Sequence, residues 1–179
     1  IVHVLMEGIQ TQRALKGVTD EQLLSLPETS DDHATAVTRA LHSIANVAFQ
    51  KGTCKEIFSI ASLRLVRWAC QKGLTKMSVF GFACYAVLLS CTGNKDQAYR
   101  FARLSLEMSS KRFKAENVDA IILSPLYHLV MHWKRPFPEC VEAFKQAFQS
   151  GMASGAVSAA FARYVSNFFG VCERESFFD

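Results

Sequence analysis

The chain is poor in the residues that interrupt or cross-link small proteins. It has four prolines and nine glycines in 179 residues, and its six cysteines include no C-x-x-C pair. The low proline and glycine content excludes disordered and collagen-like chains. The scattered cysteines exclude a small secreted scaffold that depends on disulfides. We therefore expect a single domain over residues 1–179 of a reduced, cytoplasmic protein, and a chain that is part of a longer polypeptide.

Motifs for catalysis and for nucleic-acid binding are also missing. There is no G-x-x-x-x-G-K-[ST] loop, no G-x-G-x-x-G turn and no G-x-S-x-G elbow, which are the usual scaffolds for phosphate binding and for an exposed serine nucleophile. The net charge of +4 is too small to indicate nucleic acid, and no aromatic-basic RNA-recognition pattern accompanies it. These absences predict a segment that is not an enzyme by itself, binds no nucleic acid and uses no cofactor.

No hydrophobic run clearly predicts a membrane span. The longest uncharged stretch has 18 residues between Lys76 and Lys95, which is the lower limit for crossing hydrocarbon. Ser78, Ser90 and Thr92 dilute it, and no aromatic belt flanks it. A helix that is apolar on all sides also belongs at the centre of a packed α-helical protein. We therefore expect a buried helix here and no membrane contact.

The best candidate for a metal site is the stretch HLVMHWKRPFPEC. It places His128 and His132 four residues apart, and Cys140 follows. Leu129 stands where a zinc protease needs its glutamate. A structural zinc ion would need a fourth ligand, which the neighbouring sequence does not supply. We expect no metal.

Helical periodicity is the main positive signal. Apolar residues recur at spacings of three and four between Gly52, Gly73 and Gly93, which suit the left-handed position that ends a helix. Thr19 with Gln22 is predicted to form a capping box, and Pro125 to kink or break its helix. The predicted helices span 1–16, 20–26, 31–51, 54–72, 76–92, 95–112, 115–134, 138–150 and 154–170.

Three short segments share one pattern, in which an acid or amide, a small or aliphatic residue, an aromatic and two variable residues precede an alanine. They begin at Glu56, Gln97 and Glu142. In stacked helix hairpins the aromatic fills the groove between paired helices, and the alanine lets the backbones approach. The pattern predicts an all-α solenoid of paired antiparallel helices with repeats of about 40–45 residues. The expected pairs are 31–72, 76–112 and 115–150, with leading helices in 1–30 and the start of a further pair in 154–179.

The segment GFACYAVLLSCTGNKDQAYRFARLSLEM resembles a degenerate tetratricopeptide repeat. Ala86 is near its small position, Gly93 is at its turn, and Ala98 is the small residue of its second helix.

A wider resemblance covers residues 18–170, where VTDEQLLSLPETSDDHATAVTRALHSIANVAF and HWKRPFPECVEAFKQAFQSG are similar to the helical-repeat region of very large signalling kinases. In that family a protein-kinase-like domain and a predicted ATPase precede the repeats, and sensory and histidine-kinase domains follow. The resemblance therefore implies that the parent protein is a kinase. The residues that carry it are Leu26, Pro27, Asp31, His132-Trp133-Lys134 and Gln149-Ser150-Gly151.

One basic cluster is a candidate for a partner-binding face. It would accept an acidic partner segment, or it is a solvated helix face that the acidic stretch 20–32 balances. Its members are Lys95, Arg100, Arg103, Lys111, Arg112 and Lys114.

These features predict a protein–protein interaction and signal-coupling module, whose partner is a protein, a peptide or a neighbouring domain of the same polypeptide. Two alternatives stay open. One is the regulatory arm of a nucleotide-dependent switch ATPase. The other is a small-ligand-binding domain with a pocket lined by Tyr85, Tyr127 and Trp133. Self-association through the aromatic C-terminal end is a further expectation, and the residues concerned are Phe168, Phe169, Phe177 and Phe178.

Overall fold

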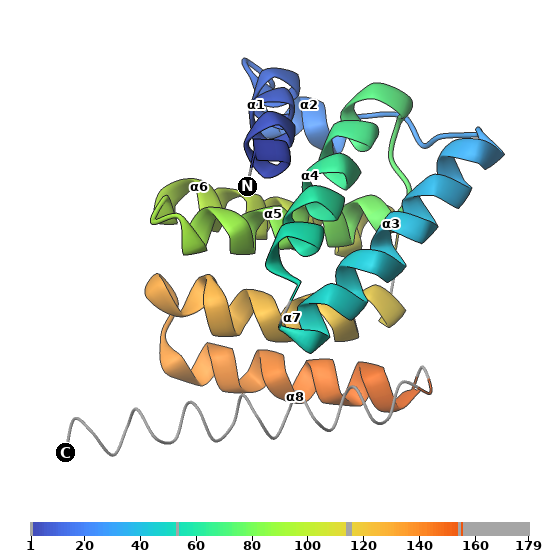
Figure 1. Cartoon of the computed structure of the whole chain (residues 1–179). Coiled ribbons are helices and arrows are strands. Elements are labelled where there is room, and N and C mark those ends of the chain that lie inside the picture. Colours follow the sequence, from blue (N-terminus) through green and yellow to red (C-terminus); the bar gives the residue numbers. More distant parts are fainter. Residues whose placement is uncertain (1, 53, 114–115, 154, 156–179) are drawn as a thin grey trace.

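The computed structural model describes residues 2–52, 54–113, 116–153 and 155 (Figure 1). A π-helical turn, η1 (Ser109–Phe113), continues α6, and a 3-10 turn, η2 (Met131–Trp133), follows α7. No strand forms in these residues, and a single parallel bridge joins Glu28 to Leu74. The prediction of an all-α fold is confirmed. The α-helices are α1 (Val2–Leu15), α2 (Asp20–Leu24), α3 (Asp32–Lys51), α4 (Lys55–Lys72), α5 (Lys76–Cys91), α6 (Lys95–Met108), α7 (Glu116–Leu129) and α8 (Phe137–Ala153).

From α3 onward, each predicted helix pair packs beside the pair that follows it in the chain. The helices of each predicted pair pack together, α3 with α4, α5 with α6 and α7 with α8. Helix α5 also contacts α3, α4 and α7, so it links the three pairs. Helices α1 and α3 both pack on α4, while α2 meets α6. In Figure 1, α7 and α8 lie side by side next to the layer of α5 and α6.

The core is built around α5. Ten consecutive residues of this helix, from Ser78 to Val87, are buried, which means that no face of its middle section reaches solvent. A helix of 3.6 residues per turn can be covered in this way only by neighbours on all sides. The buried helix predicted from the uncharged stretch is therefore confirmed.

Helices α4 and α5 approach each other closely at one glycine. A Cβ atom placed on Gly81 would lie 2.7 Å from the Cβ atom of Leu65. Leu65 is fully buried, so it cannot move out of the way into solvent. Gly81 therefore sets the separation of these two helices.

Several helix ends follow the predicted local rules. Thr19 and Gln22 form the predicted capping box, with the Gln22 N–H donating to Thr19 Oγ1 at 3.2 Å and the Thr19 N–H donating to Gln22 Oε1 at 2.9 Å. Gly52 ends α3 with φ of 66°, a left-handed conformation that glycine adopts without strain. A second capping box, formed by Thr75 and Ser78 at the start of α5, was not predicted.

Two predicted helices are shorter than expected. Helix α6 ends at Met108 and changes to the π-helical turn, and α7 ends at Leu129. Helix α7 continues through Pro125, so the alternative of a break there is wrong. Ile122 and Leu126, on the two sides of the proline, are fully buried. Their burial outweighs the one backbone hydrogen bond that proline removes.

The alanines of the repeated pattern lie where close helix packing requires them. Ala61, Ala102 and Ala147 are 3%, 0% and 5% exposed. They belong to α4, α6 and α8, which are the second helices of the predicted pairs. In the first repeat Phe58 packs against Phe49 of α3, with ring centroids 5.4 Å apart.

Two glycines in helix interiors give a matched test of this packing. Gly81→Ala should lower the free energy of unfolding by about 1–3 kcal/mol, because the new methyl group meets Leu65. Gly8→Ala in α1, where nothing lies within 4 Å of the added Cβ, should raise it by about 0.5–1 kcal/mol through helix propensity. Urea unfolding measures both changes. Equal effects of the two substitutions would contradict the close approach of α4 and α5.

A partly buried histidine makes stability depend on pH. His42 of α3 packs edge-on against Phe80 of α5, with ring centroids 4.6 Å apart, and burial lowers the pKa of His42 below its usual value. The unfolded chain therefore binds a proton more readily than the folded chain.

The free energy of unfolding should therefore be fully retained above the unfolded pKa of about 6.5 and fall as the pH decreases below it. His42→Leu should flatten this slope, whereas His33→Gln, at an exposed position, should keep it. Urea unfolding at a series of pH values is the measurement. A slope that is unchanged in His42→Leu would assign the pH dependence to other groups.

Candidate functional site

The basic cluster does not gather into one free face. Lys95, Arg100 and Arg103 lie on α6, Lys111 and Arg112 lie in η1, and Lys114 is outside the described residues. Each described member except Arg103 contacts another part of the chain through its side chain. Two of these contacts, those of Arg100 and Arg112, hold α2 in place.

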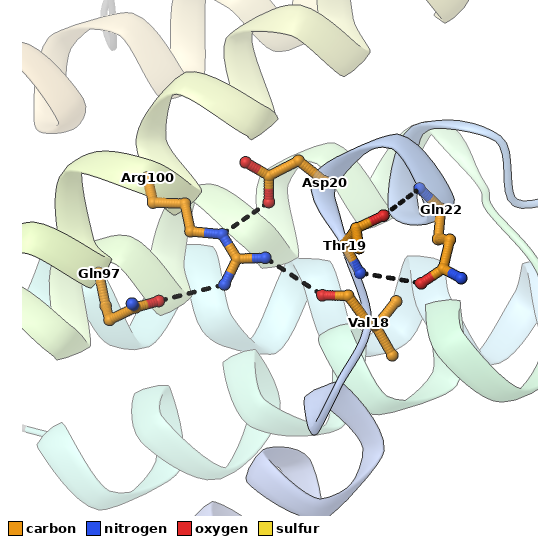
Figure 2. A network of polar contacts seen from close by, with 6 residues as sticks. All are labelled: Val18, Thr19, Asp20, Gln22, Gln97 and Arg100. Carbon is orange, nitrogen blue, oxygen red and sulfur yellow. Dashed lines mark hydrogen bonds and ion pairs between the residues drawn. The ribbon is translucent and has the colours of Figure 1, made fainter.

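Arg100 binds the start of α2, as Figure 2 shows. Its Nε donates to Asp20 Oδ1 at 2.6 Å, and a terminal nitrogen donates to the carbonyl oxygen of Val18 at 3.2 Å. The other terminal nitrogen donates to Gln97 Oε1 of its own helix at 3.3 Å. All three nitrogens of the guanidinium group are therefore engaged, and Asp20 balances its charge.

Arg112 binds the other end of α2. It donates to the carbonyl oxygens of Leu24 at 2.8 Å and Leu26 at 3.1 Å, and it lies 4.0 Å from the Glu28 carboxylate. Carbonyls at the C-terminus of a helix have no partner within the helix, and a fixed cation satisfies them well. We call Arg100 and Arg112 together the arginine clamp.

The other members of the cluster make separate contacts. Lys111 pairs with Glu107 at 2.5 Å on the exposed side, and the Lys95 ammonium lies 3.4 Å from the ring centroid of Trp133. Arg103 is exposed and makes no ion pair with a described residue. The charge balance that was predicted between this cluster and the acidic stretch 20–32 is therefore made by the direct contacts of the arginine clamp.

Helix α1 packs on α4 through polar groups. Its buried residues are Glu7 and Thr11. The Glu7 carboxylate pairs with Arg64 and Arg67, each at 2.7 Å, and Thr11 Oγ1 donates to the carbonyl oxygen of Leu63 at 3.1 Å. A charged and a polar residue are thus the most buried residues of this helix, and the apolar Val4 and Leu15 pack partly buried against the core beside them.

Four large apolar residues of α1 are exposed instead. The spacing of these residues, i, i+3, i+4 and i+7, places them on one stripe of the helix. We call them the α1 stripe: Val2, Leu5, Met6 and Ile9, which are 67%, 61%, 52% and 51% exposed. Sequence reasoning missed this inversion, because the same stripe normally faces a core.

A largely apolar cavity of about 710 Å³ lies beside α1. Its lining comes from α1, from the end of α3, the turn that follows it and the first half of α4, and from the last two turns of α5 with Leu129. Of the three residues predicted to line a ligand pocket, Tyr85 lines this cavity. Tyr127 and Trp133 do not, and Trp133 lies under Lys95 instead.

Polar residues are a minority of the cavity lining, and Tyr85 and Lys55 are two of them. Tyr85 is 6% exposed and packs edge-on against Phe101, with centroids 4.9 Å apart. Its hydroxyl makes no hydrogen bond with a described residue. Burial raises the pKa of Tyr85, against the opposite effect of Arg100. Lys55 also lines the cavity, is exposed, and forms no ion pair with a described residue.

The histidines and cysteines form no metal-binding group in the described ranges, where no three His, Cys, Asp or Glu side chains come together. The cysteines there are free thiols. Burial raises the pKa of Cys70 to about 11, which makes this thiol a poor nucleophile. Cys84 is buried, as a core thiol should be, but Cys91 at the end of α5 is exposed and lines the cavity.

Comparison with family models, curated proteins and solved structures finds no match to this chain. Within the part of the chain that the structure describes, no helix has the length and apolar character needed to span a bilayer. The aromatic C-terminal residues fall outside that part.

The arginine clamp gives a direct test. Arg112→Met should lower the free energy of unfolding by about 1–3 kcal/mol, because two charge-assisted hydrogen bonds to carbonyls are lost, and should speed hydrogen exchange in α2. Lys111→Met is the matched control, and its exposed pair should contribute no more than about 0.5 kcal/mol. If both variants lose the same stability and α2 exchange is unchanged, Arg112 does not hold α2.

Proposed function

We propose that this chain is a tetratricopeptide-like solenoid that serves as a protein–protein interaction and signal-coupling module in the cytoplasm. The observation that carries the proposal is the serial packing of three helix pairs. The first helix of the middle pair, α5, contacts α4 of the pair before it and α7 of the pair after it. Repeat proteins stack in this way, and each repeat then contacts only its neighbours.

The setting of the module follows from the resemblance of residues 18–170 to the repeat region of large signalling kinases. Such a module stands between a nucleotide-binding part and a sensory part of one polypeptide. Its role is to couple one part to the other through its contacts with both. The parent protein is a kinase. The fixed arrangement around α5 supports this role, because a buried central helix moves with its neighbours as one body.

The α1 stripe is the surface that we assign to the partner. Isolated exposed apolar residues are common, but a contiguous row on one helix face is typical of a protein interface. The charge of α1 indicates the partner's chemistry. Its acid, Glu7, is buried, while Arg13 and the following Lys16 remain near the helix end. The partner is therefore an amphipathic helix with acidic residues beside its apolar face.

Site-specific photo-crosslinking in cells of the source organism tests this assignment. A photoreactive amino acid at Met6 should crosslink to one segment that has the pattern of an acid-flanked amphipathic helix, as identified by mass spectrometry. The same group at the exposed Glu142 of α8 is the matched control.

A synthetic peptide of the crosslinked segment then measures affinity. Met6→Glu should weaken its binding by about tenfold or more, because an acid replaces an apolar contact beside acidic residues. Gln146→Glu on α8 should change the affinity less than about twofold. Crosslinking that is the same at both positions, or a crosslink from Met6 to a second copy of this chain, would contradict the assignment.

A further inference from the structure

Helix α3 presents a second apolar face to solvent. The helix packs on α4 and α5 and lies along one side of the molecule in Figure 1. Ala34, Thr38 and Ala45 are buried on its inner side. On its outer side two large apolar residues, Ile44 and Val47, are 47% and 53% exposed. Neighbouring exposed apolar residues on one helix face are typical of an interface.

The exposed residues of this face have the spacing of a contact between two helices. Ala36, Ala40, Ser43 and Val47 are all exposed and recur at intervals of four, three and four residues. This alternation of four and three is the heptad spacing that keeps one helix face against another along its length. Ile44 borders the same row, and none of the five residues is charged. We call these five residues the α3 seam.

Charges of opposite sign stand at the two ends of the α3 seam. Asp32 precedes it in the first turn of α3, and Lys51 follows it in the last turn. Both residues are exposed, and neither forms an ion pair with a described residue. A helix with the same two charges that lies antiparallel on this face would place each charge beside its opposite. A parallel arrangement would place like charges together, which is unfavourable.

The α3 seam is also complementary to itself in size. The register of an antiparallel pair of copies is fixed when Asp32 of one copy lies level with Lys51 of the other. Val47 of each copy then lies level with Ala36 of the other. A large side chain therefore meets a small one twice, as a ridge on one helix fills a groove on another. Ala40 lies close to the two-fold axis, where its small size lets the two backbones approach.

We propose that the α3 seam is the contact of a homodimer, in which two copies of this chain pack antiparallel along α3 around a two-fold axis. A second copy matches the seam in size and in charge at once, and the two-fold axis repeats each favourable contact. The dimer goes beyond the interaction function, because the α1 stripe lies on another helix. A dimer carries two α1 stripes and so offers two sites to a bivalent partner.

Sedimentation equilibrium of the full chain measures this dimer. One helix from each copy gives an interface at the small end of specific interfaces, so we expect a dissociation constant of about 10–100 μM. Ala40→Arg should weaken association by about tenfold or more, because two large charged side chains then meet beside the two-fold axis. Gln146→Arg, at an exposed position of α8, is the matched control and should leave association unchanged. Circular dichroism checks that both variants fold.

Reversal of the end charges tests the antiparallel direction. Asp32→Lys and Lys51→Asp should each weaken association by about threefold or more, because like charges then lie level with each other. The double variant again places opposite charges together and should recover the association that each single variant loses. Thermal unfolding at a concentration where the chain is monomeric separates this effect from that of the reversed charges on α3 itself.

Engineered cysteines test the register. In the proposed dimer the two copies of residue 40 are three residues apart in level, so their Cα atoms lie about 6 Å apart. Ala40→Cys should therefore form a disulfide between copies on mild oxidation, since that separation suits the bond. The two copies of residue 36 are about 16 Å apart along the helix axes, so Ala36→Cys should not. The parent chain measures the background from its own cysteines.

Four results would overturn the proposal. The first is a chain that stays monomeric at millimolar concentration. The second is association that Ala40→Arg leaves unchanged, because another surface then joins the copies. The third is a disulfide that forms as fast in Ala36→Cys as in Ala40→Cys. The fourth is a crosslink from a photoreactive amino acid at Ser43 to another segment of the same chain or to a different protein, because that occupant then covers the α3 seam.

Discussion

The burial of α5 on every side is the constraint on which the rest of the fold depends. Its residues from Ser78 to Val87 are all inside, so each neighbouring helix must cover one part of its circumference. Helix α6 follows it in the chain, α4 approaches it at Gly81, α7 covers another side, and α3 reaches it beside α4. A change that moved any one of these helices would expose part of a helix that has almost no polar side chain to offer to water.

Polar side chains link α5 to its neighbours without interrupting this apolar packing. Ser105 of α6 donates to the carbonyl oxygen of Val79 at 2.9 Å, and Ser90 of α5 donates to that of Leu129 at 2.8 Å. Serine hydroxyl groups are small enough to fit between closely packed backbones. Their hydrogen bonds are directional, whereas the apolar contacts around them are not. Helix α1 differs, because its most buried contacts with α4 are the ion pairs of Glu7 with Arg64 and Arg67, and its apolar contacts with the core are only partly buried. Its attachment to α4 therefore depends on the geometry and charge of these contacts. The cavity lies along another side of the same helix.

Local features were predictable from the sequence, and features that depend on distant pairing were not. The extent of α5 follows from a run of uncharged residues, and the capping box at Thr19 follows from two residues three apart. The inversion of α1 does not, because Val2, Leu5, Met6 and Ile9 have the spacing of a core stripe. Only the pairing of Glu7 with arginines 57 and 60 positions later decides which side faces inward. The cavity was missed for the same reason, since residues of α1, α3, α4, α5 and α7 line it together.

The arginine clamp also affects the order in which the chain can become structured during synthesis. Asp20 and Arg100 are 80 residues apart, and Leu24 and Arg112 are 88 apart. A ribosome that adds about 5–20 residues per second therefore releases α2 several seconds or more before its arginines exist. Throughout that interval α2, a helix of five residues, is too short to be stable alone. The segment that contains α2 must consequently stay open to chaperones or to later segments of the chain until η1 has left the exit tunnel.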